Sequence, residues 1–233
     1  MEWFWVTWSM YRRVFKRAAA LAGRNWPVLL TTFAYMLIMS VAALLAPLFG
    51  LVGGLLLTLV WAACVGSFLY LVEMIVQTSR VTLQDFRGSF GAYLWDVVGV
   101  SFVLWVFWMI VTPALHRTPH GYAIVQCIQL AGFVLFNAVP ELIYLGRCTS
   151  LQLFAESYAF IGSNWIEWFP ANLAAAAVIY PVASAPLAEP LSYLQLGFVS
   201  LLVYFAMIMR GLLFLELQGT SRRGRAYKYR IEG

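Results

Sequence analysis

Charged residues are scarce in this sequence. Asp, Glu, Lys and Arg together make up 11% of its 233 residues, whereas 63% are hydrophobic. A soluble domain carries about 25% charged and about 45–50% apolar residues. The composition therefore excludes a soluble enzyme, a soluble nucleic-acid-binding protein and a disordered chain, and it predicts an integral membrane protein.

The sequence also lacks the motifs of common catalytic and ligand sites. Its three cysteines form no CxxC pair, and there is no HExxH zinc motif, P-loop, GxGxxG loop or acidic cluster for Mg²⁺. His116 and His120 have the spacing of a metal pair, but Pro119 between them disfavours a helix. We therefore predict no enzyme active site, no cofactor and no metal.

Six apolar runs are long enough to cross a membrane as helices, which takes about 20 residues each. They cover residues 28–49, 51–77, 97–115, 121–146, 166–185 and 191–217. Together with their connections they use nearly the whole chain. The sequence thus predicts an all-α integral membrane protein with one six-span domain, residues 1–220, and a basic tail, residues 221–233.

Basic residues lie almost entirely on one side of this predicted topology. Thirteen fall before the first span, after the last, or in the loops after the second and fourth spans, whereas the other side holds Arg117. Short loops rich in Lys and Arg face the cytoplasm. We predict a multi-pass protein of the cell inner membrane with both termini cytoplasmic.

The net charge of +5 comes from basic residues next to the predicted spans. We therefore predict membrane lipids, and not nucleic acid, as partners. Five basic residues fall within residues 222–230, so we expect the tail to contact anionic lipid. The alternative is that the tail acts only as a topological stop signal. Other membrane subunits are further candidate partners.

The segments ahead of the third and fifth spans resemble each other. Residues 82–97 and 150–165 share Leu-Gln, then a Phe, a Ser three residues after it, and an aromatic residue next. An Asp or Asn follows ten residues after each Phe. The N-terminal segment repeats that last spacing. The aligned pairs are Phe15 with Asn25, Phe86 with Asp96, and Phe154 with Asn164.

We interpret these similarities as three parallel hairpin repeats, about residues 9–78, 79–147 and 148–220. Each repeat would begin with a short amphipathic helix lying in the membrane interface, followed by one span out and one span back. The predicted interfacial helices are residues 9–24, 82–95 and 149–163. The residues that close them are expected to cap the spans that follow: Asn25, Asp96 and Asn164.

Charges inside the spans are the candidate site residues, because each costs free energy to insert. They are Arg210 and three glutamates near the cytoplasmic ends of the even spans, Glu73, Glu141 and Glu216. We expect Arg210 to pair with Glu73 or Glu141, either as a clamp between hairpins or as a charged substrate or ion site. Pro140 is expected to kink the fourth span.

Two short patterns resemble those of a group of uncharacterised bacterial six-span inner-membrane proteins. One is Asn25-Trp26 at the end of an interfacial helix, and the other is Ser150-Leu-Gln-x-Phe-x-x-Ser-Tyr158 ahead of a later hairpin. That group includes the membrane domain attached to some glycerophosphodiester phosphodiesterases. The resemblance implies the six-span fold and carries no catalytic residue.

Three functions fit these patterns. The first is a non-enzymatic scaffold, accessory subunit or lipid-contacting factor. The second is a small transporter or channel with a charged site around Arg210. The third is a membrane enzyme acting on lipids, for which the acids and histidines are too scattered.

Overall fold

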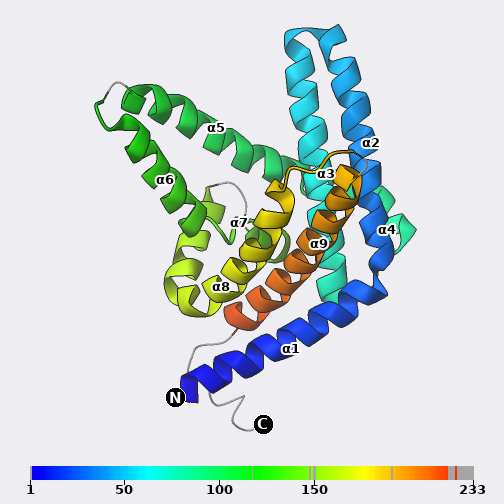
Figure 1. Cartoon of the computed structure of the whole chain (residues 1–233), viewed down its shortest axis with the longest axis vertical. Helices are drawn as coiled ribbons and strands as arrows, with labels where there is room; N and C mark the ends of the chain where they lie inside the picture. Colours follow the sequence, from blue (N-terminus) through cyan, green and yellow to red (C-terminus); the bar gives the residue numbers. More distant parts are fainter. Residues whose placement is uncertain are drawn as a thin grey trace. The chain divides into compact units, whose positions relative to one another are not determined.

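The computed structural model describes residues 2–116, 118–146, 148, 151–189, 191–219 and 224, and for residues 2–4, 51 and 116 the backbone alone. Every regular element in this part of the chain is a helix (Figure 1). Six helical segments are long and apolar enough to cross a membrane, which confirms the predicted class. They are Trp26–Phe49, Val52–Thr78, Leu94–Leu115, Gly121–Gly146, Gln152–Ser184 and Leu191–Gln218.

These segments combine α-helices with short 3₁₀ and π turns. The α-helices are α1 (Glu2–Arg24), α2 (Leu29–Leu45), α3 (Leu51–Thr78), α4 (Leu83–Gly88), α5 (Leu94–His116), α6 (Gly121–Leu135), α7 (Val139–Glu141), α8 (Gln152–Ser184) and α9 (Leu191–Gln218). Turns of 3₁₀-helix cover Trp26–Val28, Ala46–Phe49 and Ser89–Gly91, and a π-helix covers Leu142–Gly146. The predicted tail lies outside the described residues, apart from Gly224.

The chain forms two compact units. The first comprises Met1–Leu37, Leu71–Asp85 and Asn164–Gly233, and the second comprises Ile38–Tyr70 and Phe86–Ser163. The first unit holds α1, α9 and the later part of α8. The second holds α5, α6 and α7. The three predicted repeats stay a prediction.

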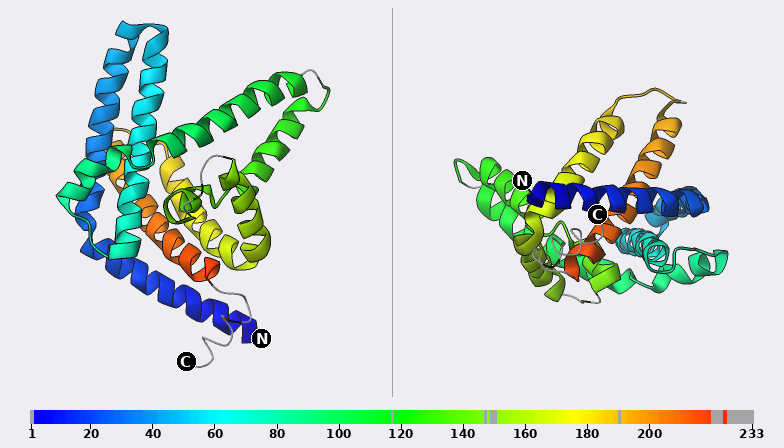
Figure 2. Two further views of the ribbon diagram at one scale, coloured as in Figure 1. Left: turned by 180° about the vertical axis from the view of Figure 1, so that it is seen from behind. Right: turned by 90° about the horizontal axis from the view of Figure 1, so that it is seen from below.

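In the first unit, α1 lies against α9 and crosses it (Figures 1 and 2). Met10, Val14 and Ala18 recur every four residues and are buried, as expected of one helix face. The opposite face carries exposed basic residues. The structure confirms the predicted helix over residues 9–24 and begins it earlier, at Glu2.

The helix predicted over residues 82–95 is confirmed over its first part and is shorter than predicted. Helix α4 ends at Gly88, and a 3₁₀ turn over Ser89–Gly91 follows. Glycine is a poor helix former because it loses the most backbone entropy on ordering, and Gly88 and Gly91 occur within four residues of each other.

The helix predicted over residues 149–163 is confirmed from Gln152 onward. Element α8 covers Gln152–Ser184 and consists of two helices that meet at a kink at Asn164, which has φ −126° and ψ 15°. Asn164 therefore lies at the predicted junction between the leading helix and the fifth span.

The fourth span is interrupted near Pro140, as predicted. Helix α6 ends at Leu135, and the short α7 begins at Val139. Proline lacks a backbone N–H and clashes with the preceding turn, so it sits in the first turn of the new helix. In the same unit, α5 and α6 are in contact near the ends that follow one another in the chain, and they diverge away from these ends (Figure 2).

Two serines aligned by sequence, Ser89 and Ser157, make similar contacts in the second unit. Ser89 Oγ shares a hydrogen bond of 2.5 Å with Ser67 Oγ, and Ser157 Oγ donates to the Leu135 carbonyl at 2.9 Å. Both serines are fully buried. Each reaches a residue 22 positions earlier in the chain.

The segments ahead of the first and fifth spans bury their side chains at matching positions of the sequence alignment. The matched buried residues are Val14 and Leu153, Ala18 and Ser157, Leu21 and Phe160, and Asn25 and Asn164. In the second segment Ser89 is buried, whereas Ala92 is exposed and Asp96 half-buried. The interruption at Gly88 accounts for this difference, because it changes which side chains share a face.

Candidate functional site

Arg210 is held between α8 and α9 in the first unit. Its Nη1 donates to Asn172 Oδ1 at 3.0 Å, and its guanidinium carbon lies 5.2 Å from the centre of the Trp168 ring. Asn172 Nδ2 in turn donates to the Trp168 carbonyl at 2.7 Å. Arg210 is half-buried, and an amide oxygen and an aromatic face both stabilise a cation in such a position. The sequence identified Arg210 as a site residue without singling out these two partners.

The three candidate glutamates occupy different environments. Glu73 Oε1 accepts a hydrogen bond from Gln77 Nε2 at 3.0 Å on α3, one turn away. Glu141 is fully buried in α7, and Glu216 is half-buried on α9. Pairing of Arg210 with Glu73 or Glu141 stays a prediction.

Asn25 does not cap the span that follows it, contrary to the prediction. It occupies the cap position of the Trp26–Val28 turn but makes no side-chain cap bond there. Its Nδ2 donates to the carbonyls of Leu21, at 2.9 Å, and Ser79, at 3.2 Å. Its Oδ1 accepts from the Val81 N–H at 3.0 Å. Asn25 therefore joins the end of α1 to the loop after α3.

Asp96 is not a cap residue either. Helix α5 begins at Leu94, so Asp96 is its third residue and lies within the first turn. An acid in that turn still interacts favourably with the positive end of the helix dipole. Asn164 lies at the kink of α8, where a cap role stays a prediction.

Glu167 is a buried acid that the sequence analysis missed. It lies at the start of the predicted fifth span and is 2% exposed. Its backbone carbonyl accepts a hydrogen bond from the Tyr11 hydroxyl at 2.6 Å, which ties α1 to α8. The signal was present in the sequence, because an acid in the first turn of an apolar span is costly unless it is buried with partners.

Tyr11 should titrate above the ordinary range for tyrosine. Burial, followed by the negative charge of Glu167, raises the pKa of Tyr11 from 10.0 to about 12. The unfolded chain then loses this proton at a lower pH than the folded chain does. The stability that Tyr11 contributes is complete below pH 10 and is lost as the pH rises through about 12.

We therefore expect the melting temperature of the wild-type protein to fall more steeply than that of Tyr11→Phe between pH 10 and pH 12. Thermal unfolding in detergent across this range measures the difference. The difference in tyrosinate absorbance between the two proteins should titrate near pH 12, and titration near pH 10 would contradict the prediction.

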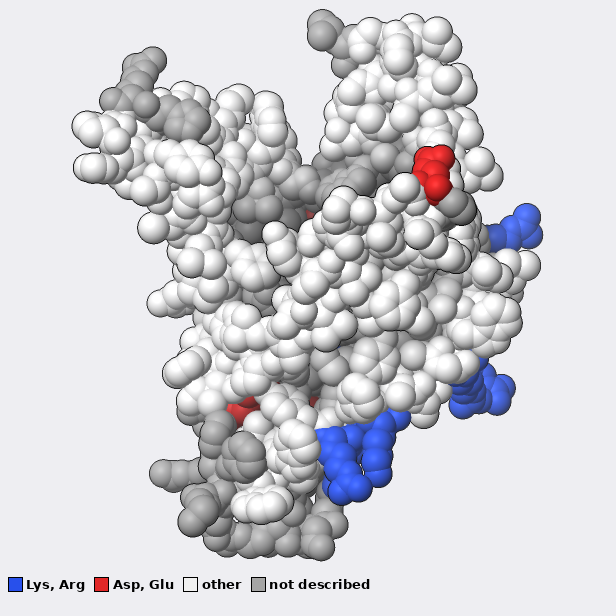
Figure 3. Space-filling view, viewed as in Figure 1, with Lys and Arg blue, Asp and Glu red and all other residues white. Residues whose placement is uncertain are grey.

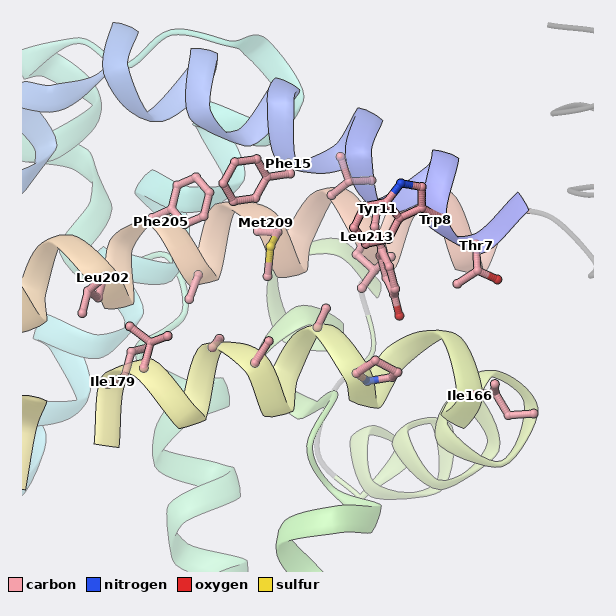
Figure 4. A pocket seen from close by; sticks show the side chains of 17 residues that line it. Thr7, Trp8, Tyr11, Phe15, Ile166, Ile179, Leu202, Phe205, Met209 and Leu213 are labelled. Carbon is pink, nitrogen blue, oxygen red and sulfur yellow. The ribbon is translucent and has the colours of Figure 1, made fainter. Parts of the chain in front are cut away.

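A groove of about 720 Å³ lies between α1, α8 and α9, all within the first unit (Figure 4). Apart from Thr7 and Tyr11, its lining side chains are apolar. The lining residues are Thr7, Trp8, Tyr11, Val14 and Phe15 from α1, Ile166, Pro170, Ala171, Ala174, Ala175, Val178 and Ile179 from α8, and Leu202, Phe205, Ala206, Met209 and Leu213 from α9.

Small side chains on α8 open this groove. Ala171, Ala174 and Ala175 share one side of the helix, because residues three and four apart are neighbours on a helix surface. Phe15 and Phe205 meet edge to face across it with their ring centres 5.2 Å apart. The alanines leave space that the large side chains of α1 and α9 border but do not fill.

The two ends of the groove differ in polarity. Thr7 and Tyr11 lie near Ile166, whereas Leu202 and Ile179 line the other end (Figure 4). Thirteen residues of α8 separate Ile166 from Ile179, a distance of about 20 Å at 1.5 Å per residue. The groove is therefore long and apolar, with polar groups at one end.

Basic side chains are exposed along α1 (Figure 3). Arg12, Arg13, Lys16 and Arg17 are all exposed. Among the described residues, no group of three His, Cys, Asp or Glu side chains could hold a metal ion. His120 is exposed, and Arg117 and the side chain of His116 lie outside the described part of the chain.

No protein family, curated protein or solved structure matches this sequence. The groove and the Arg210 cluster therefore have to be interpreted from their own geometry.

Proposed function

We propose that this protein is a non-enzymatic, multi-pass protein of the cell inner membrane that binds a membrane lipid. The lipid's acyl chain would lie in the groove between α1, α8 and α9. The observation that carries the proposal is the groove itself, which is apolar along its length and has polar groups at one end. Its volume of about 720 Å³ falls within the range of ligand pockets, about 300–1,000 Å³.

The length of the groove suits an acyl chain. The hydrocarbon core of a bilayer is about 30 Å thick, so one leaflet contributes about 15 Å. The groove extends about 20 Å along α8, which is enough for the chain of one leaflet. Lipid tails are as apolar as leucine, so shape and van der Waals packing, more than the hydrophobic effect, would retain the lipid.

The proposed orientation places α1 at the cytoplasmic interface. The charge asymmetry of the loops supports cytoplasmic termini, and the amphipathic pattern of α1 is typical of an interfacial helix. In this orientation the Thr7 end of the groove meets the headgroup region and the Ile179 end lies deeper. The matched burial and the similar serine bonds support the three parallel repeats.

Filling the groove should release the bound lipid. Ala174→Phe adds a large side chain on the lining face of α8, and we expect at least a tenfold loss of phospholipid retained through purification. Ala176→Phe is the matched control. Ala176 is exposed and does not line the groove, because two steps along a helix turn the side chain by about 200°. Native mass spectrometry of the full chain measures the retained lipid.

Equal lipid retention by the two variants and the wild type would contradict the proposed function. Both variants must keep the wild-type melting temperature, so that loss of lipid is separated from loss of fold. If Ala174→Phe unfolds, Ala174→Leu provides a smaller filling side chain for the same comparison.

A small transporter or channel with a charged site at Arg210 is the second candidate. The half-buried cation between α8 and α9 supports it. The contacts of Arg210 with Asn172 and Trp168 join two neighbouring helices, which favours a structural clamp. A transporter would stay folded and lose its activity when Arg210 is replaced, whereas a clamp would lose stability.

A further inference from the structure

We propose that the groove takes an anionic phospholipid, with the phosphate beside Arg12 and Lys16 on α1. This inference rests on the proposed function, because the groove must first hold a lipid. It adds the charge of the headgroup and the residues that recognise it.

The first step is the position of the two basic residues. Trp8 lines the groove, and Arg12 and Lys16 follow it by four and eight residues. Side chains four residues apart lie above one another on a helix, so these three form one row. Arg13 and Arg17 lie about 100° further round α1, on the side turned away from Trp8.

The second step is the border between apolar and charged groups. Trp8 and Phe15 both line the groove and are 58% and 55% exposed. Tryptophan is enriched where the hydrocarbon meets the headgroups, so Trp8 marks that level. Arg12 and Lys16 therefore lie at the depth where a phosphate would be when its acyl chain occupies the groove.

The third step is the sign of the local charge. Helix α1 carries five basic residues and a single acid, Glu2. The nearby Glu167 is buried, so it is not on the surface that the headgroup would contact. An anionic headgroup would complement this charge, and a zwitterionic headgroup would gain less from it.

The experiment compares phosphatidylglycerol with phosphatidylcholine carrying the same acyl chains. Each lipid is titrated into the detergent-purified full chain, and binding is followed by native mass spectrometry. We expect the wild type to prefer phosphatidylglycerol, and the preference to shrink as salt is raised. A basic residue near an anionic surface contributes about a fivefold effect, so Arg12→Gln with Lys16→Gln should reduce the preference roughly 25-fold.

The matched control removes the same charge from the other side of α1. Arg13→Gln with Arg17→Gln should keep most of the preference. Equal losses for the two pairs would overturn the inference, because the charge would then act diffusely. A wild-type protein without any preference would overturn it while leaving the proposed function intact, provided that Ala174→Phe still releases both lipids.

Two other outcomes concern the occupant. A dimer that Ala174→Phe dissociates would assign the groove to a second copy of the chain and overturn the inference. Retention of phosphatidylglycerol by Ala174→Phe at the wild-type level would overturn both the inference and the proposed function. Two results together would support the inference and the proposed function. Ala174→Phe would release phosphatidylglycerol, and the variant with Arg12→Gln and Lys16→Gln would selectively lose the headgroup preference.

Discussion

Replacing Asn25 with leucine is expected to lower the free energy of unfolding by about 2–4 kcal/mol. The side chain is 5% exposed and makes three hydrogen bonds at the junction of α1 with the loop after α3. Leucine has a similar size but can make none of them. The Ser79 carbonyl and the Val81 N–H would lose their Asn25 partner, at about 1–3 kcal/mol each.

The backbone conformation of this loop offsets part of the expected cost. Ser79 has a φ of +64°, a left-handed conformation that side-chain-bearing residues rarely adopt. The bonds from Asn25 to Ser79 and Val81 hold the loop on both sides of Arg80. Without Asn25, the loop can relax from this strained conformation, and the end of α1 loses its tie to α3.

Thermal and denaturant unfolding in detergent measure this effect. Gln77→Ala is a suitable control, because it removes an exposed side-chain bond to Glu73 on the same helix and should cost at most about 0.5 kcal/mol. An Asn25→Leu protein as stable as Gln77→Ala would contradict the assigned role of Asn25.

Replacing Arg210 with methionine is expected to have the second large effect, a loss of about 2–4 kcal/mol. A hydrogen bond to a charged group contributes about 1.5–3 kcal/mol, and a cation over an aromatic ring about 0.5–2 kcal/mol. The bond of Arg210 to Asn172 is of the first kind, and its position over the Trp168 ring is of the second. Methionine fills a similar volume and keeps neither contact.

Two further variants show whether these contacts are the cause. Arg210→Lys keeps the charge but loses the planar guanidinium, so it should recover part of the stability. In a double-mutant cycle, Arg210→Met and Asn172→Ala should show a coupling energy of about 0.5–3 kcal/mol. Strict additivity would contradict direct coupling, and an unchanged melting temperature of Arg210→Met would exclude the clamp.

Local patterns in the sequence determined the helices. Long apolar runs can satisfy their backbone polar groups in a membrane only as helices, so residues such as 51–77 and 191–217 were predicted close to their structural bounds. Pro140 predicted the break in the fourth span, because a missing N–H disrupts a helix wherever it lies. In contrast, Gly88 and Gly91 carried a local signal against the helix predicted over residues 82–95, and that signal was overlooked.

The candidate site depended on tertiary structure. Arg210 was predictable as a costly charge, but its contacts with Asn172 and Trp168 depend on how α8 and α9 are rotated against each other. Asn25 was expected to cap the next helix, because capping is the local option for an asparagine, whereas its side chain bonds to residues more than fifty positions away. Glu167 could be identified from the sequence as an acid in a span. Its burial, and the bond between its backbone carbonyl and the Tyr11 hydroxyl, could not be predicted.

The sequence by itself therefore determined which segments are helical and which of them can cross a membrane. Both properties depend on residues within a few turns of one another. The groove was decided by the tertiary structure alone, because it requires Ala171, Ala174 and Ala175 of α8 to face Phe15 of α1 and Phe205 of α9. Helix crossing and rotation arise from the packing of whole surfaces, and many rotations bury similar apolar areas in a sequence this hydrophobic.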